Sequence, residues 1–166
     1  IQKMYKICDV TFDDIYPIWK EDLWPGRISK FDQISLLTIR NGDLVKEMGV
    51  KKFKDSVSFY AIVYISDYVE ENVKIVGVNS SVFTGLGLYR SRGLWVHPNH
   101  RGLGLSKILL QYAIVKAKEQ NCHTIWSLPR ENALPMYESV GFEKQSDWIN
   151  DVEFGPNCIV TRPINL

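Results

Sequence analysis

The feature that most constrains this chain is the stretch VHPNHRGLGLSKILL at residues 96–110, where an extended segment gives way to a helical one. Two glycines, Gly102 and Gly104, stand just before apolar residues at helical spacing. The first N–H groups of a helix lack partners within it and lie at its positive end, so they bind anions well. Glycines let the backbone approach such an anion closely, and Arg101 adds a charged fork suited to phosphate. Residues 101–106 are therefore predicted to cradle a phosphorylated ligand.

The best-known phosphate loops do not match this stretch. A P-loop requires G-x-x-x-x-G-K-[ST], which is not present here. A dinucleotide-binding fingerprint requires a third glycine where Lys107 stands, and it should follow an early parallel strand. Taken alone, two glycines are also consistent with a simple turn at the start of a helix.

The first half of the chain is divided by clear turn signals and one weakly patterned segment. Thr11 is a candidate helix cap, and the LWPGR segment breaks the helix that Thr11 opens. The expected elements are a strand over Met4–Val10, a helix from Thr11 to the break at 23–27, a second helix over Asp32–Arg40 and a turn at Asn41-Gly42; residues 43–56 are left unassigned.

From Val57 onward the chain is rich in β-branched and aromatic residues, with turns at DYVEEN and GLG. This composition predicts an antiparallel meander of three strands over 57–66, 73–84 and 88–96. Further elements are expected as a helix over Gly104–Gln120, a strand over 123–128, a helix over Ala133–Ser139 that ends at Gly141, and an extended segment over Asn157–Arg162. Without internal repeats or linkers, residues 1–166 are expected to form one α+β or α/β domain.

Composition argues against several classes of function. Twenty Lys and Arg residues against 19 Asp and Glu give a net charge of +1, which provides no global field to attract nucleic acid or an anionic membrane. No apolar run is long enough to span a bilayer. Cys8, Cys122 and Cys158 form no CxxC pair, and the three histidines have no zinc-binding spacing. We therefore expect a cytoplasmic protein without a metal, nucleic-acid or membrane partner.

Two separated motifs point to one family. VHPNHRGLGLS resembles the signature Arg/Gln-x-x-Gly-x-Gly/Ala, which follows a strand ending in Val-x-Pro, with Ser106 where Gly or Ala is usual. RENALPMYESVGF at 130–142 is similar to a second segment, Asn-x-x-Ala followed by Tyr-x-x-x-Gly-Phe, and IVGVNS to the usual entry to the central sheet. Both motifs are those of the GNAT superfamily, the Gcn5-related N-acetyltransferases. The clear similarity covers 73–142, whereas the N-terminal strand and paired helices fit only the family order.

The resemblance implies the GNAT acyl-CoA acyltransferase fold, a mixed, mostly antiparallel sheet of six or seven strands flanked by about four helices. It also implies acetyl-CoA as co-substrate, with its pyrophosphate on the loop amides and its pantetheine arm between two splayed strands. Asn132 would hydrogen-bond that arm, or instead cap the helix that follows. The implied cofactor-binding residues are Leu94, Trp95, Val96, His97, Arg101, Gly102, Leu103, Gly104, Leu105, Ser106, Asn132 and Tyr137.

Catalytic roles follow from the same resemblance. An N–H near Val96 would polarise the acetyl carbonyl, on which negative charge grows as the amine attacks. Tyr137 would protonate the leaving thiolate, although a tyrosine in an amphipathic helix is by itself ordinary packing. The strand LYRSRGLWV contains no carboxylate to serve as general base, and the turn that carries Asp67, Glu70 and Glu71 has no fixed place. A water chain to backbone carbonyls is the expected route for the amine proton.

The acceptor pocket is expected around the LWPGR link and the neighbouring strands. Its candidate residues are Trp24, Arg27, Tyr60 and Arg92, with Arg90 as an alternative to Arg92, and each of them is also consistent with packing or an exposed surface. Arginines at such a site would suit a substrate that carries a carboxylate.

The sequence leaves two classes of function open. The first is an acetyl-CoA-dependent N-acetyltransferase that moves an acetyl group directly to a primary amine of a small molecule or peptide in a ternary complex. The second is a non-catalytic acyl-CoA-binding sensor or interaction module, which the missing strand carboxylate favours and Tyr137 disfavours. Homodimers are frequent in such families, and the sequence leaves the oligomeric state open.

Overall fold

The structure is a computed structural model that describes residues 4–27, 31, 34–40, 43–51, 57–66, 73–151 and 155–165. In chain order its elements are β1 (Met4–Val10), α1 (Phe12–Ile18), the π-helical turn η1 (Trp19–Leu23), β2 (Ile34–Arg40), β3 (Asp43–Lys51), β4 (Val57–Ile65), β5 (Val73–Gly85), β6 (Leu88–Val96), the 3-10 turn η3 (Pro98–His100), α2 (Leu105–Glu119), β7 (Thr124–Ser127), the 3-10 turn η4 (Glu131–Ala133), α3 (Leu134–Ser139), β8 (Glu143–Lys144), β9 (Ile149–Asp151), β10 (Gly155–Asn157) and β11 (Val160–Pro163).

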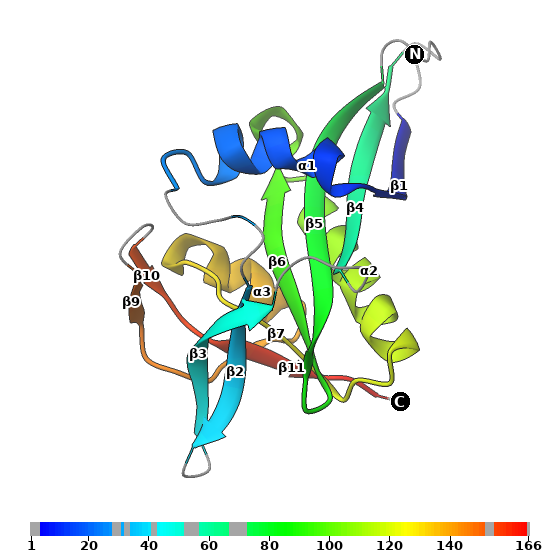
Figure 1. The fold of residues 1–166 in the computed structure, drawn as a ribbon. Coiled ribbons are helices and arrows are strands. Elements are labelled where there is room, and N and C mark those ends of the chain that lie inside the picture. Colours follow the sequence, from blue (N-terminus) through cyan, green and yellow to red (C-terminus); the bar gives the residue numbers. More distant parts are fainter. Residues whose placement is uncertain are drawn as a thin grey trace.

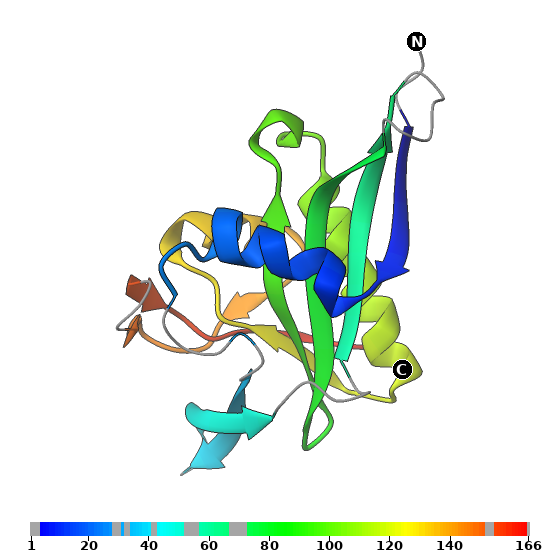
Figure 2. The ribbon, with the colours of Figure 1, turned by 45° about the horizontal axis from the view of Figure 1, so that its top comes forward.

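A seven-stranded sheet in the order β1-β4-β5-β6-β7-β11-β8 forms the centre of the fold. Its neighbours pair antiparallel except for β6 and β7, which pair parallel. Figures 1 and 2 show α1 lying across one face of the sheet and α2 along the other. The mixed, mostly antiparallel sheet expected for the family is thus confirmed, and so is the meander of β4, β5 and β6.

Each face of the sheet has its own hydrophobic core, because alternate residues of a strand point to opposite faces. On the face covered by α2, here called the α2 face, Tyr60 and Tyr89 pack with Leu109 of the helix. On the opposite face, the α1 face, Ala61 and Trp95 pack with α1 and η1. Consecutive residues of one strand therefore point into different cores, so neighbouring residues of β6 can contact different groups at the site.

The N-terminal helix begins as its sequence predicts. The Asp14 carboxylate accepts hydrogen bonds from the N–H and the hydroxyl of Thr11, both at 2.9 Å. These bonds hold the pKa of Asp14 below its usual value, and they satisfy an end group of the helix that would otherwise lack a partner. Ile15 is fully buried against the sheet, and Trp19 continues the chain into η1.

The predicted second helix over Asp32–Arg40 is wrong. Residues 34–40 form β2, which pairs antiparallel with β3 in a separate two-stranded sheet. ISLLTIR carries apolar residues that suit a helix face as well as a strand, and the pairing with the charged segment 43–51 decided in favour of the strand. The turn predicted at Asn41-Gly42 lies outside the described residues. The small β9–β10 sheet was also unforeseen.

The second half of the chain follows the prediction closely. Helix α2 begins directly after Gly104, β7 lies within the predicted strand, and α3 ends two residues before Gly141. The last extended segment starts later than predicted, because β11 begins at Val160. Three α-helices are present among the described residues, where about four were expected, since the segment of the predicted second helix joins the β2–β3 sheet instead.

Candidate active site

The central parallel strands part soon after they meet. Strand β6 pairs with β7 only from Leu88↔Thr124 to Arg90↔Trp126, yet β6 runs on to Val96 while β7 ends at Ser127. Past Arg90 the next β6 residue still contacts β7, because the Ser127 hydroxyl donates to the Ser91 carbonyl at 2.9 Å. Beyond that bond, no strand among the described residues pairs with β6 on the β7 side. We call this opening the β6–β7 divergence (Figure 1).

The Val96 amide lies at the end of β6, where the main chain borders the divergence. The His97 N–H donates to the Val76 carbonyl of β5 at 2.8 Å, so this amide points away from the divergence. Because amides alternate in direction along a strand, the N–H of Val96 points toward the side that β7 has left. Of the expected strand donors, Val96 thus faces the divergence, and His97 is engaged by β5.

The loop that opens α2 has the conformation needed to hold an anion. Gly102 and Gly104 have φ angles of +79° and +80°, in the left-handed region that favours glycine. A Cβ added to either would meet no atom within 4 Å, so the space over both residues is open. Gly104 is the N-cap of α2 and makes no side-chain capping bond, and residues 101–104 are exposed. The loop therefore leaves the first amides of α2 open to an anion.

Side-chain hydrogen bonds connect this loop to β6 and β1. Arg101 donates from Nε to the Val96 carbonyl at 2.9 Å, so its fork ties the loop to β6 while its positive charge stays close by. His97 accepts from the Asn99 N–H at 3.0 Å, and His100 is hydrogen-bonded through Nδ1 to the Tyr5 hydroxyl of β1 at 2.8 Å. These bonds thus hold the N-terminal part of the loop against β6 and β1.

Tyr137 of α3 lies beside the divergence with its ring buried. Its hydroxyl lies 3.3 Å from that of Ser127, and its ring meets that of Phe142 edge to face with centroids 5.3 Å apart. Burial raises the pKa of Tyr137, whereas the Ser127 hydrogen bond and the Arg90 charge act against this rise. The phenol is therefore protonated at neutral pH and can donate its proton.

A buried network of hydrogen-bonded polar side chains connects to Tyr137 through Ser127, and it was not predicted from the sequence. Asn79 donates to the Tyr60 hydroxyl at 3.1 Å and to the Ser91 hydroxyl at 2.9 Å, and Ser91 joins Ser127 through its carbonyl. Asn79 and Ser91 are fully buried. The only signal in the sequence is small polar residues within strands that are otherwise apolar, and this pattern does not identify their partners.

The candidate acceptor residues do not all lie on the same face of the sheet. The Arg92 guanidinium lies over the rings of Trp19 and Trp24, with its carbon 5.3 Å and 5.0 Å from their centroids. Arg27 lies over Trp24 as well, at 4.7 Å. These three candidates, Trp24, Arg27 and Arg92, therefore gather on the α1 face. Tyr60 belongs to the core of the α2 face and is fully buried.

Asn132 lies in η4 and is exposed. The N-cap of α3 is Ala133, without a side-chain capping bond, so the alternative role of Asn132 as a helix cap is not observed. The remaining cofactor candidates divide by burial: Trp95, Val96 and Leu105 are buried, Leu94 and Ser106 are half-buried, and Leu103 is exposed.

A tryptophan from η1 fixes the shape of β6 where the register shifts. The pairing of β5 with β6 passes from Val78↔Trp95 to Ser80↔Arg92, so two residues of β6 stand opposite one of β5. Gly93, with φ +83°, lies in this bulge, and its carbonyl accepts from Trp19 Nε1 at 2.9 Å. The bulge bends the strand directly before the main chain that borders the divergence.

The chain belongs to the Acetyltransferase (GNAT) family, whose profile matches residues 14–142. Its general chemistry is therefore acyl transfer from acyl-CoA. A search of curated proteins found no match.

Solved structures share the fold at low identity. The ribosomal-protein-S18-alanine N-acetyltransferase from Escherichia coli is 15% identical, with a TM-score of 0.65 over 98% of this chain and 96% of that one. An acetyltransferase of the GNAT family from Staphylococcus aureus is 14% identical, with a TM-score of 0.63 over 98% and 100%. A Bacillus anthracis protein, provisionally described as a streptothricin acetyltransferase and solved with acetyl coenzyme A, is 15% identical, with a TM-score of 0.60 over 98% and 99%.

Among the described residues, no set of His, Cys, Asp and Glu side chains is grouped as a metal would need. Within the same residues, no helix is both long and apolar enough to cross a bilayer.

Proposed function

We propose that this protein is an N-acetyltransferase that transfers the acetyl group of acetyl-CoA directly to a primary amine. The amides at the start of α2, from Gly102 to Ser106, would hold the pyrophosphate, and the arm would run along β6 into the divergence. The Val96 N–H would then donate to the thioester carbonyl. Asn132, exposed at the start of the α3 segment, is the proposed polar contact for the arm.

The chemistry needs few groups from the chain. The amine nitrogen attacks the thioester carbon, the C–N bond forms and the C–S bond breaks. The electron pair of the broken bond leaves on sulfur, and Tyr137 donates its phenolic proton to that thiolate. The proton released by the amine passes to water, and water returns a proton to the Tyr137 phenolate, which restores the acid. Holding both reactants in place supplies much of the rate, because the step becomes effectively unimolecular.

One observation carries the proposal: a buried, protonated tyrosine lies beside the point where β6 and β7 part. Its hydroxyl lies 3.3 Å from that of Ser127, and the phenol proton can rotate toward a group in the divergence. A non-catalytic acyl-CoA sensor would need the same loop but no acid at this position. The position of Tyr137 therefore favours the enzyme over the sensor.

The Tyr137→Phe variant tests this choice. We expect it to lower kcat for CoA release by about 10²- to 10⁴-fold, the usual range for a general acid, and to leave acetyl-CoA binding within about twofold. Free thiol released from acetyl-CoA with an amine library reports turnover, and calorimetry reports binding. Met136→Leu, a neighbouring change on α3, is the matched control. Wild-type protein that binds acetyl-CoA but acetylates no amine in the library would favour the sensor.

A further inference from the structure

A row of polar side chains crosses the α2 face at the level of the β6–β7 divergence. Tyr60 of β4 stands opposite Asn79 of β5 in the strand pairing, and the two side chains are hydrogen-bonded. Asn79 is bonded in turn to Ser91 of β6, which is joined through its carbonyl to Ser127 of β7. Tyr137 of α3 ends the row beside Ser127. Four neighbouring strands and one helix thus each contribute one polar group to a largely apolar core.

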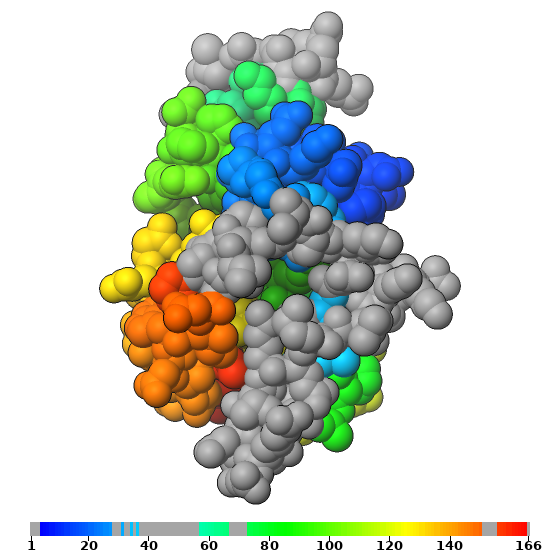
Figure 3. Space-filling model, turned by 60° about the vertical axis from the view of Figure 1, so that its left-hand side comes forward, coloured from blue at the N-terminus to red at the C-terminus, as the bar shows by residue number. Residues whose placement is uncertain are grey.

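The central part of this row is shielded from solvent. Tyr60, Asn79 and Ser91 each have an exposed fraction of 0%. In the view of Figure 3, only a small area of the central strands, drawn in green, is visible between the N-terminal segment in blue and the C-terminal segment in orange. Buried polar groups are costly without hydrogen-bond partners, so the bonds within the row fix how its members are oriented.

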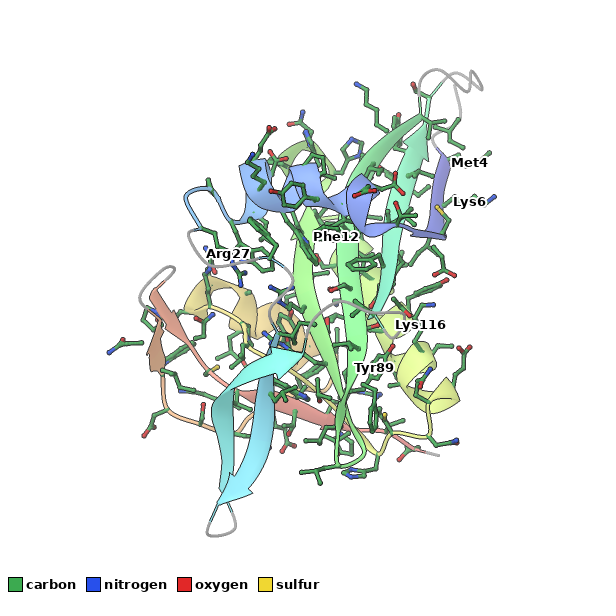
Figure 4. The ribbon with its side chains drawn as sticks, viewed as in Figure 1. Met4, Lys6, Phe12, Arg27, Tyr89 and Lys116 are labelled. Carbon is green, nitrogen blue, oxygen red and sulfur yellow. The ribbon has the colours of Figure 1, made fainter. Side chains whose placement is uncertain are left out.

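Helix α2 fixes the far end of the row. The Tyr60 ring meets the ring of Tyr112 with centroids 4.8 Å apart, and the Lys116 ammonium lies 5.8 Å from the Tyr60 centroid. Figure 4 shows Lys116 on this helix. Because its ring is held in this way, the Tyr60 hydroxyl is a fixed acceptor for the Asn79 amide, 3.1 Å away. The other N–H of that amide is thereby directed at Ser91.

The Ser91 hydroxyl can give its own proton to Tyr137. Asn79 Nδ2 donates to Ser91 Oγ at 2.9 Å, a shorter contact than the 3.3 Å between Ser91 Oγ and Asn79 Oδ1. Ser91 therefore accepts from Asn79 and keeps its proton for another acceptor. Burial raises the pKa of Tyr137, and hydrogen bonds from Ser127 and Ser91 lower it. The phenol oxygen is thus an acceptor within reach of both serine hydroxyls.

Such a donor matters most when the acid gives up its proton. A phenol is a weaker acid than a thiol, so its proton passes to a thiolate only at a cost in free energy. Burial increases this cost, because it disfavours the charged phenolate. A hydrogen bond to an ionised oxygen is stronger than one to a neutral oxygen. A bond from Ser91 to the phenol oxygen therefore strengthens as the proton leaves.

We propose that Ser91, oriented by Asn79, is a positioning residue that holds the phenol oxygen of Tyr137 and stabilises the phenolate formed when this acid reacts. This inference rests on the proposed acetyl transfer and deepens it. In the acid step the proton moves from Tyr137 to the sulfur of the departing thiolate, and the negative charge passes to the phenol oxygen. The hydroxyls of Ser91 and Ser127 donate to that oxygen until water restores its proton.

A double-mutant cycle tests whether Ser91 acts through Tyr137. Ser91→Ala should lower kcat for CoA release by about three- to tenfold, the range for one hydrogen bond, with KM for acetyl-CoA unchanged. In the Tyr137→Phe background the same change should lower kcat no further, because the group that Ser91 serves is gone. Ser91→Thr, which keeps the hydroxyl, should recover most of kcat. Equal losses in the two backgrounds would overturn the inference.

A site-specific titration gives a readout that does not depend on turnover. Tyr137→3-fluorotyrosine makes this phenol more acidic, and its fluorine resonance follows the ionisation of that ring alone. Ser91→Ala should raise the pKa of the fluorophenol by about 0.5–1, and Asn79→Ala should raise it too, because Ser91 then loses its orienting partner. The matched control is Ser80→Ala. Ser80 is a buried serine of β5 that donates to the Arg92 carbonyl at 2.6 Å, so its loss should leave this pKa unchanged.

The outcomes separate this inference from the proposed function. If Tyr137→Phe lowers kcat but Ser91→Ala leaves the pKa of the fluorophenol unchanged, acetyl transfer stands and the inference is overturned. If Tyr137→Phe keeps its kcat, the acid step of the proposed function fails, and the inference fails with it. If no amine is acetylated, the titration decides, because a raised pKa in Ser91→Ala supports the inference and an unchanged one overturns it. Ser91→Ala alone decides if Asn79→Ala does not fold.

Discussion

The Ser127 hydroxyl lies 3.3 Å from the Tyr137 hydroxyl and 2.9 Å from the Ser91 carbonyl. Ser127, the last residue of β7, therefore links Tyr137 on α3 to the neighbouring strand β6. In the proposed function this side chain fixes the phenol oxygen relative to the main chain that would carry the thioester. Ser127 would then be a positioning residue, because it would touch no reacting atom.

Replacing Ser127 with Ala should slow the chemical step. We expect kcat to fall by about three- to tenfold, the worth of one neutral hydrogen bond, with KM for acetyl-CoA unchanged. The pKa of Tyr137 should rise further, since the hydrogen bond from Ser127 opposes the effect of burial. Steady-state rates and ultraviolet titration of the phenol measure the two effects. Ser127→Thr, which keeps the hydroxyl, should recover most of kcat, and failure to do so would point to packing alone.

Gly104→Ala should weaken acetyl-CoA binding. A Cβ here is free of clashes in the protein but enters the open space over the loop, and φ +80° costs an alanine about 1–2 kcal/mol. We expect KM for acetyl-CoA to rise by about tenfold or more. Gly85→Ala is the matched control, because Gly85 has φ +98° and equally open space at the end of β5, away from the loop. Equal effects of the two variants on KM would argue against a phosphate cradle.

Gly93→Ala should destabilise the protein and disturb the site together. The added Cβ would lie 2.3 Å from Trp19 Cζ2, at a φ of +83°. Overpacking and backbone strain together should cost about 2–5 kcal/mol of unfolding free energy, measurable in urea. Trp19→Phe shortens the ring that causes the clash. The double variant should therefore lose less stability than the sum of the two single ones, and additive losses would contradict this contact.

Acid should weaken the link between β1 and α2. Burial alone would raise the pKa of Asp9, but hydrogen bonds from Lys116 at 3.1 Å and Tyr112 at 2.9 Å outweigh it and hold the pKa below 3.8. The lowered folded pKa means that Asp9 contributes stability above its unfolded pKa and loses the contribution as pH falls through the folded value.

The Asp9→Asn variant tests that sign. It should have a lower Tm than the wild type at pH 7, and the difference should shrink below about pH 4 as the wild-type carboxylate protonates. The expected effect is small because Asp9 is largely exposed. Asp13→Asn, on the exposed first turn of α1, serves as control. A Tm difference that stays constant down to pH 2 would contradict the role of this charge.

Local signals in the sequence were enough for much of the fold. Met4–Val10 was predicted with its observed bounds, and the start of α2 follows directly from Gly104. Both depend on neighbours in the chain: β-branched residues for the strand, and a left-handed glycine for the helix start. The segment 34–40 was misjudged because its local pattern allows a helix, and only its partner 43–51 selects the strand.

The candidate site, too, could be predicted only in part from the sequence. The loop from Arg101 to Ser106 is contiguous, so its glycines and its place before a helix were visible in the sequence, and Tyr137 was marked by its spacing to Gly141. What the sequence left open was which distant residues meet: Ser127 with Tyr137, Trp19 with Gly93, and Arg27 with Arg92 over one indole. Each of these pairs joins elements that are far apart in the chain. Such contacts depend on the twist, register and divergence of strands, which are properties of the whole sheet, and so the tertiary structure alone decided them.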